Sequence, residues 1–263
     1  MRKYLDYSWI GIKEHTAYAG AVRANFVSKI VYLYMQFAMW TALFASNAGK
    51  DVPMSRDGTL RYVIVATILS AFVECDVIGR INQQIRTGDI ANRLIRPMDF
   101  RAMVFFRQLG TSAAGLVLYA LPLTILIALL YREPLVCSEQ LPYGILSVLL
   151  AYLIQFLYSL IIGLMAFWLI VTWPLNMLLA AIYKLLSGAW IPAAMFPDLL
   201  AKINLFLPFR AIYAIPVSII TTPMSQDSIR SELGVQLLWA VILFGIAELT
   251  WHAGRKKLIV QGG

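Results

Sequence analysis

The chain has 263 residues, of which 60% are apolar or aromatic and 14% are charged, against about 45–50% and about 25% in an average soluble domain. This composition excludes an ordinary soluble globular protein. The net charge is +8, and because charged residues are few, the basic excess must gather in short segments that face anionic surfaces. Lipid headgroups are the first such surface, and we expect no nucleic acid partner.

Residues 1–24 predict an amphipathic helix that lies in the membrane interface. Leu5, Trp9 and Ile12 follow one another at i, i+4 and i+7 and so share one face of a helix, which is the pattern of an interfacial segment. Charged residues occupy the place where a cleaved signal peptide carries its apolar core, so insertion must rely on the spans. The alternative is a frayed cytoplasmic end without membrane contact.

Six apolar stretches have the length of a membrane-spanning helix, which needs about 20 residues. The clearest evidence is the segment 140–183, where 44 consecutive positions carry no charge. This segment holds two spans and a short turn at Trp173 and Pro174. The predicted spans are 27–46, 62–80, 108–130, 142–172, 175–195 and 232–251. We therefore predict an all-α polytopic membrane protein with six transmembrane helices.

The distribution of basic residues predicts the orientation of the chain in the membrane. An even number of spans places both termini on one side, and that side carries fourteen Lys and Arg residues against seven on the other. Because basic residues are retained in the cytoplasm, we expect a multi-pass protein of the cytoplasmic (inner) membrane with both termini cytoplasmic.

The cytoplasmic connection after the second span, 81–101, has the pattern of two short helices. Gly88 can take the left-handed conformation that ends a helix, and Asp89 can cap the next one. Pro97 then stops the second helix. Apolar pairs give this knob an apolar edge, and three arginines form its rim: Ile81 and Ile85, Ile90 and Leu94, then Arg86, Arg93 and Arg96. The alternative for the arginines is a role as topology anchors at lipid headgroups.

Residues 196–222 are apolar but interrupted by prolines. The prolines leave pieces of 10, 7 and 6 residues, and none of these can cross a bilayer of about 30 Å at a rise of 1.5 Å per residue. We expect a broken helical hairpin that re-enters the outer leaflet against the other spans, since broken backbone exposed to lipid would be unsatisfied. The alternative is an apolar external loop.

Four ionisable residues fall inside predicted spans, where such groups are costly and usually face protein or water: Glu74, Asp76, Lys184 and Glu248. Asp76 can pair with Arg80, and Lys29 lies at a depth where it can pair with Glu74 or Glu248. The functional alternative is a substrate path, in which carboxylates attract cationic or amphiphilic cargo. Because positions 74 and 76 point about 200° apart on a helix, we expect that they do not both face one cavity.

Sequence motifs of catalysis and metal binding are missing from the chain. It contains no GxxxxGK[ST] phosphate-binding loop, GxSxG elbow or HExxH pair, and its two cysteines and two histidines lie far apart. We therefore expect no catalytic residues, no metal site and no cofactor in this chain. The longest connection, 81–107, has 27 residues, below the usual domain minimum of about 50, so residues 1–263 are predicted to form a single transmembrane domain.

The connection 81–101 resembles that of the permease subunits of ABC-2-type transporters, in particular the branch with a pattern like IRxGxLxxxLxxP after the second span. The matching residues are Ile85, Arg86, Gly88, Asp89, Ile90, Leu94, Arg96 and Pro97. Ile90 stands where the family more often has leucine. The predicted topology is similar to that of the family over nearly the whole chain.

The resemblance implies a permease that lacks its own ATPase. It would work with a second permease, identical or similar, and with two ABC ATPase subunits that bind ATP and Mg²⁺. Residues 81–101, with Arg93 among them, would couple the permease to the ATPases. The outer hairpin would form part of the external gate, with Pro197, Pro208, Phe209 and Pro216. We therefore expect a subunit of an ATP-driven exporter of a lipid, peptide or amphiphilic, cationic drug-like substrate.

Two other classes compete with this interpretation. An ion-coupled secondary transporter or channel would show flux that depends on protons or sodium without an ATPase partner. A membrane enzyme acting on lipids would turn over as the purified chain. The sequence has no inverted repeat, which disfavours the secondary transporter.

Overall fold

The computed structural model describes residues 2–46, 52–95, 97–131, 134–169 and 173–261, and in these parts the chain forms helices and connections without a strand. The all-α prediction is therefore confirmed for the described residues. The helices are α1 Arg2–Thr16, α2 Ala19–Ala45, α3 Arg56–Val73, α4 Val77–Arg86, α5 Asp89–Leu94, α6 Phe100–Gly115, α7 Leu121–Leu130, α8 Leu141–Leu164, α9 Trp173–Leu186, α10 Asp198–Leu205, α11 Ala214–Thr221 and α12 Gln226–Gln261.

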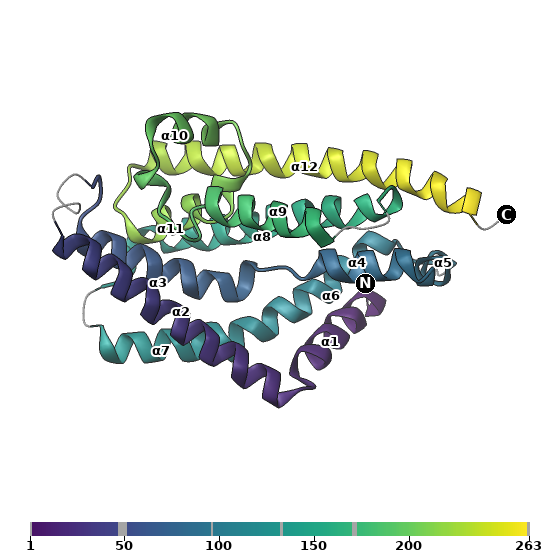
Figure 1. Ribbon diagram of the computed structural model, residues 1–263, viewed down its shortest axis with the longest axis horizontal. Helices are drawn as coiled ribbons and strands as arrows, with labels where there is room; N and C mark the ends of the chain where they lie inside the picture. Colours follow the sequence, from purple (N-terminus) through teal and green to yellow (C-terminus); the bar gives the residue numbers. More distant parts are fainter. Residues whose placement is uncertain (1, 47–51, 96, 132–133, 170–172, 262–263) are drawn as a thin grey trace.

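The long helices run side by side in an elongated bundle (Figure 1). The short helices α10 and α11 gather at one end. The opposite end carries α4, α5 and the C-terminal end of α12, and the N-terminus of α1 lies toward it. This placement agrees with the prediction that both termini share one side, while the side itself stays a prediction.

Four segments are long and apolar enough to cross a membrane: Arg56–Arg86, Phe100–Leu130, Ser138–Phe167 and Gln226–Lys257. They correspond to the predicted second, third, fourth and sixth spans. The predicted first span falls in α2, which has 27 residues but carries tyrosine, tryptophan and glutamine side chains that lower its mean hydropathy. The predicted fifth span falls in α9, whose apolar part Asn176–Leu186 is shorter. The chain is thus multi-pass, and the count of six stays a prediction.

The fifth predicted span, 175–195, differs from the observed helix. α9 begins at Trp173, so that Pro174 lies in its first turn as predicted, but the helix ends at Leu186. Gly188 follows with a φ of 87°, in the left-handed region that ends helices. A Cβ atom at Gly188 would lie 2.5 Å from the hydroxyl of Tyr62, so glycine is required here for both conformation and space.

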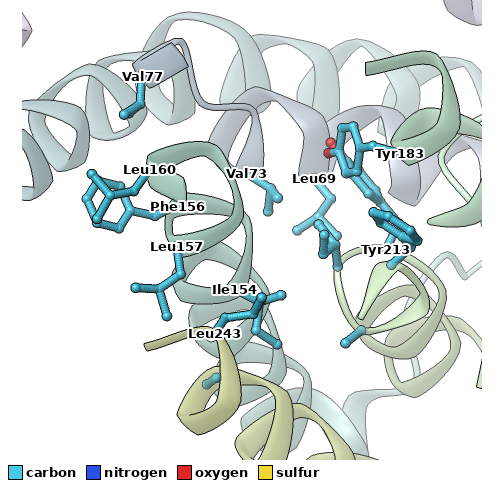
Figure 2. Packing of buried hydrophobic residues seen from close by; sticks show 14 of the residues in the cluster. Leu69, Val73, Val77, Ile154, Phe156, Leu157, Leu160, Tyr183, Tyr213 and Leu243 are labelled. Atoms are coloured by element: carbon cyan, nitrogen blue, oxygen red, sulfur yellow. The ribbon is translucent and has the colours of Figure 1, made fainter. Parts of the chain in front are cut away.

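Helix α8 lies at the centre of the hydrophobic core (Figure 2). Ile154, Leu157 and Leu160 of α8 are at most 4% exposed and pack in one cluster with α3 and α12. A polar contact lies in the same interface: the Ser147 hydroxyl donates to Gln236 Oε1 at 2.8 Å, and the Gln236 amide donates to the Ser147 carbonyl at 3.1 Å. Paired polar groups of this kind hold helices together where water is excluded.

Helix α1 is packed closely on α6. A Cβ atom on Gly11 would overlap the Arg107 carbonyl, and one on Gly110 would overlap the Ser8 carbonyl, so the glycines bring the two backbones into contact. The Ser8 hydroxyl donates to the Phe106 carbonyl at 2.8 Å. The predicted segment 1–24 is shorter as a helix, since the chain breaks after α1 and α2 begins at Ala19.

The outer face of α1 carries two of the three apolar residues that the sequence analysis singled out, Leu5 and Trp9, while Ile12 is half-buried. Leu5 is 60% exposed and Trp9 is 57% exposed. Because these side chains point away from the bundle, they agree with an interfacial helix. The depth of α1 in a membrane stays a prediction.

The predicted broken hairpin, 196–222, forms α10, a short 3-10 turn at Phe209–Ala211, and α11. The two halves differ in burial. Val217 and Ile219 of α11 are fully buried, whereas Leu199 and Phe206 in and next to α10 are more than 70% exposed. The proline-bounded pieces are therefore helical, and α11 belongs to the bundle, while re-entry into the membrane stays a prediction.

We predict that Gly110→Ala destabilises the protein, because the added methyl group must displace the backbone of α1. Overpacking of this kind costs about 1–3 kcal/mol, and it should lower the thermal unfolding midpoint in detergent. Gly245→Ala in α12 is the matched control, since a Cβ atom there meets nothing within 4 Å and alanine favours a helix by about 1 kcal/mol. Equal midpoints for the two variants would contradict the close packing of α1 on α6.

Candidate functional site: a polar cavity between the helices

A cavity of about 780 Å³ lies among α2, α3, α6, α8 and α9. This volume is in the range of sites for small organic ligands. Its lining is unusually polar for a bundle of apolar helices. The hydrophilic residues that line it include His15, Asn25, Ser28, Lys29, Thr67, Ser70, Glu74, Asp76, Arg80, Gln108, Thr111, Ser112, Gln155, Ser159 and Lys184.

A break between α3 and α4 forms one wall of this cavity. α3 ends at Val73, Glu74 is extended with ψ 130°, and α4 begins at Val77; Figure 1 shows the extended stretch. Glu74 and Asp76 both line the cavity. The expectation that they do not share a cavity was therefore wrong, because it assumed an unbroken helix through 62–80.

Glu74 lies between two lysines from different helices. Its carboxylate is 3.4 Å from Lys29 Nζ of α2 and 4.0 Å from Lys184 Nζ of α9. Lys29 also donates to the Ser70 hydroxyl at 2.9 Å. The predicted pairing of Lys29 with a carboxylate is confirmed with Glu74 as the partner, and the same carboxylate is the partner of Lys184. These contacts join α2 and α9 to the break after α3.

The other two predicted intramembrane charges have different surroundings. Asp76 lies 4.0 Å from Arg80, as its spacing predicted. Glu248 of α12 is not among the residues that line the cavity. It pairs with Arg101 and lies 3.6 Å from His252, which favours the alternative of structural pairing for Glu248, with a partner other than Lys29. The reason is that Phe100 stacks on Trp251, with ring centroids 5.2 Å apart, and thereby brings Arg101 to α12.

Two glutamines on the cavity wall were missed by the sequence analysis. Gln108 of α6 and Gln155 of α8 are at most 5% exposed, and each donates its amide to a serine four residues later, Ser112 and Ser159, at 3.3 Å. Their Oε1 atoms have no hydrogen-bond partner among the described residues. A glutamine followed by a serine at i+4 in an apolar span was the signal that would have found them.

Aromatic residues close the cavity on the side of the segment after α9. The Gln36 amide of α2 donates to the Tyr32 hydroxyl at 2.7 Å and to the Trp190 carbonyl at 3.2 Å. Tyr32 and Trp190 both line the cavity, as do Tyr158 and Tyr183. A backbone carbonyl of the non-helical segment after α9 is thus satisfied by a side chain of α2, as broken backbone in a membrane protein requires.

The predicted coupling segment forms two short helices at the end of the bundle opposite α10. α4 ends at Arg86 and α5 begins at Asp89, with Gly88 between them at a φ of 74°, as predicted. Asp89 does not cap α5; its carboxylate pairs with Arg93 at 3.2 Å. Arg96 lies outside the described residues.

The apolar edge of the coupling segment is divided between core and surface. Ile81 and Ile90 are fully buried, and Ile81 packs against Gly163 of α8. Leu94 and Ile95 are exposed, at 36% and 82%, and Arg86 and Pro97 are exposed as well. The part of the edge that remains available for another protein is therefore smaller than the sequence pattern indicated.

The predicted outer-gate residues lie at the end of the bundle that carries α10. Pro197 precedes α10, Pro208 precedes the 3-10 turn, and Pro216 lies in α11. Phe209 is buried against the Tyr158 ring, with centroids 5.6 Å apart. The neighbouring Arg210 pairs with Glu232 of α12.

Among the described residues, no group of three or more His, Cys, Asp and Glu side chains lies close enough together to hold a metal ion.

Comparison with protein families gives a match to the family described as ABC-2 family transporter protein over residues 30–262. Because the match covers most of the chain, the protein belongs to the ABC-2 transporter family and is a permease of that type. A comparison with curated proteins gives no match.

The ion pair of Glu248 with Arg101 allows a test of whether Glu248 has a structural role. We predict that Glu248→Gln lowers the free energy of unfolding by about 1–3 kcal/mol, because it leaves the half-buried Arg101 with one carboxylate fewer. Asp76→Asn is the control, since its pair with Arg80 is longer and its carboxylate is 81% exposed. Thermal unfolding of both variants in detergent measures the difference, and equal loss in the two would contradict a structural role for Glu248.

Proposed function

We propose that this chain is the permease subunit of an ATP-driven exporter in the cytoplasmic membrane. Two separate ABC ATPases energise it, and a second permease, identical or similar, completes the transmembrane part. The substrate is an amphiphile such as a lipid, a peptide or a drug-like molecule. The observation that carries the proposal is the polar cavity among apolar helices in a chain of the ABC-2 family.

The coupling segment supports this proposal by its position. α4 continues from the break that lines the cavity, and α5 lies at the far end of the bundle with Arg86, Leu94 and Ile95 exposed. An exposed helix pair with apolar and basic side chains can dock into a groove of another protein. Motion of an ATPase bound there would reach the cavity through a single short helix.

The contacts at the end of the bundle that carries α10 and α11 support the proposed export. α11 is buried in the bundle, and the segment before it is joined to α12 by the pair of Arg210 and Glu232. A substrate leaving the cavity toward this end must pass Tyr183, Tyr213 and the segment after α9. We propose that the region of Pro197, Pro208, Phe209 and Pro216 forms the external gate.

The first experiment is mild extraction of the tagged protein from its own membranes, followed by identification of the co-purifying chains by mass spectrometry. The proposal expects a protein with a phosphate-binding loop at near-equal stoichiometry to the permeases. A chain that comes out alone from several mild detergents would overturn it. Flux that depends on protons or sodium, or lipid turnover by the isolated chain, would then assign one of the alternative classes.

We predict that Gly88→Val uncouples ATP hydrolysis from transport, because a β-branched residue is strained at a φ of 74°. Gly88→Asn is the matched control, since asparagine tolerates the left-handed region and no atom lies within 4 Å of a Cβ at this position. Transport and ATPase activity are measured together in reconstituted vesicles. Normal coupling in Gly88→Val would remove α4 and α5 from the coupling role.

We also predict that Arg86→Glu weakens the attachment of the ATPase, because it reverses an exposed charge at the end of α4. The variant should still insert in the membrane, and the ratio of ATPase to permease after extraction measures the effect. Lys202→Glu in α10, at the opposite end of the bundle, is the control. An unchanged ratio in Arg86→Glu would contradict the proposed docking face.

A further inference from the structure

We infer that the polar cavity binds the anionic headgroup of an amphiphile, such as a phosphate or a carboxylate, and that the ammonium of Lys184 is its ligand. This inference rests on the proposed function, since it names the class of substrate for the same cavity. Among the substrate classes expected from the sequence, it favours an anionic amphiphile over a cationic one. The following observations carry it.

The charges that line the cavity do not cancel. Among the described lining residues, Lys29, Arg80 and Lys184 are cationic, and Glu74 and Asp76 are anionic. His15 also lines the cavity, and burial together with the nearby Arg80 lowers its pKa, so it stays neutral at neutral pH. The cavity therefore carries one positive charge in excess, which an anionic group would balance.

The two lysines at Glu74 are held to different degrees. Lys29 is 18% exposed and contacts both Glu74 at 3.4 Å and Ser70 at 2.9 Å. Lys184 is 42% exposed and lies 4.0 Å from Glu74, at the limit of an ion pair. Lys184 is thus the cation that can turn to a ligand without breaking a close contact.

A cationic substrate fits this arrangement less well. To reach Glu74 it would have to compete with both lysines, and Lys29, which is 18% exposed, would lose its carboxylate partner. An anion that binds Lys184 leaves Lys29 paired with Glu74. The arrangement therefore accepts an anion at a lower cost than a cation.

The size and walls of the cavity indicate a headgroup larger than a free ion. A volume of about 780 Å³ exceeds what one phosphate fills. Gln108 and Gln155 add to the polar lining of the same cavity. Apolar helices surround the polar wall, and the acyl tail of an amphiphile requires such apolar surface next to the site of its headgroup.

The test uses the extracted permease with its co-purifying chains in a non-ionic detergent. Two fluorescent probes with the same alkyl tail are compared by anisotropy, one with a phosphate headgroup and one with a trimethylammonium headgroup. The wild type should prefer the phosphate probe. Lys184→Gln should weaken this binding about tenfold, in line with the loss of a charge-assisted hydrogen bond, while Lys184→Arg should keep it.

The Glu74→Gln variant distinguishes a site for an anionic headgroup from a site for a cationic one. Removing this competitor for the lysines should leave phosphate-probe binding as tight or tighter, whereas a cation site would lose its acceptor. Lys202→Gln, an exposed lysine outside the cavity, is the matched control and should bind as the wild type. The elution profile in size-exclusion chromatography shows that each variant is folded, and Lys184→Arg against Lys184→Gln keeps the test valid if Glu74→Gln does not fold.

Preference for the trimethylammonium probe, equal binding by Lys184→Gln and the wild type, or no binding of either probe would overturn the inference. If inorganic phosphate displaced the phosphate probe at equal affinity, the site would bind anions, but the inference that its ligand is an amphiphile would be wrong. Because these measurements do not depend on ATP, a failure to find an ATPase partner is a separate result that concerns the proposed function.

Discussion

Glu74 forms ion pairs with two ammonium groups, those of Lys29 of α2 and Lys184 of α9, at the point where α3 stops being helical. The Glu74 side chain is 47% exposed, and its two ion pairs require that α2 and α9 both lie next to the break. The polar cavity lies beside these two ion pairs, and all three of the residues that form them line it. Where α8 meets α3, α4 and α12, apolar side chains pack closely around Ile154, Leu157 and Leu160 (Figure 2).

Polar contacts between helices also stabilise the backbone where helices are interrupted. Each place where a helix ends inside the bundle leaves carbonyl groups that need a donor, and side chains of neighbouring helices supply it. Tyr62 donates to the Gly188 carbonyl at 2.9 Å, Asn204 donates to the Leu186 carbonyl at 2.9 Å, and Gln36 donates to the Trp190 carbonyl. The outer end of α9 is therefore held by α2, α3 and α10 together, which makes the shape of the cavity dependent on all of them.

The sequence predicts what depends on local pattern. Hydropathy finds the long helices, Gly88 marks the turn between α4 and α5, and the spacing of Asp76 and Arg80 predicts their contact. Contacts made over long distances in the chain are a different matter. The break at Glu74 contains no proline or glycine, and the partners of Glu74 and Glu248 come from helices whose rotation the sequence does not fix. Glu74 contacts both Lys29 and Lys184 because of how the helices pack. The same packing determines which charged residues line the cavity, and so its excess of positive charge.

The break after α3 also explains how a distant motion can reach the cavity. α4 is fixed to α8 by the contact of Ile81 with Gly163, where a Cβ atom on the glycine would lie 3.1 Å from the isoleucine side chain, so α4 can tilt about this contact more easily than it can slide. In the proposed function, an ATPase that moves α5 tilts α4, and the non-helical residues 74–76 between α3 and α4 take up the change. The carboxylate of Glu74 then shifts relative to Lys29 and Lys184. The longer of its two contacts, with Lys184, is the first to open, and it releases a cation that lines the cavity.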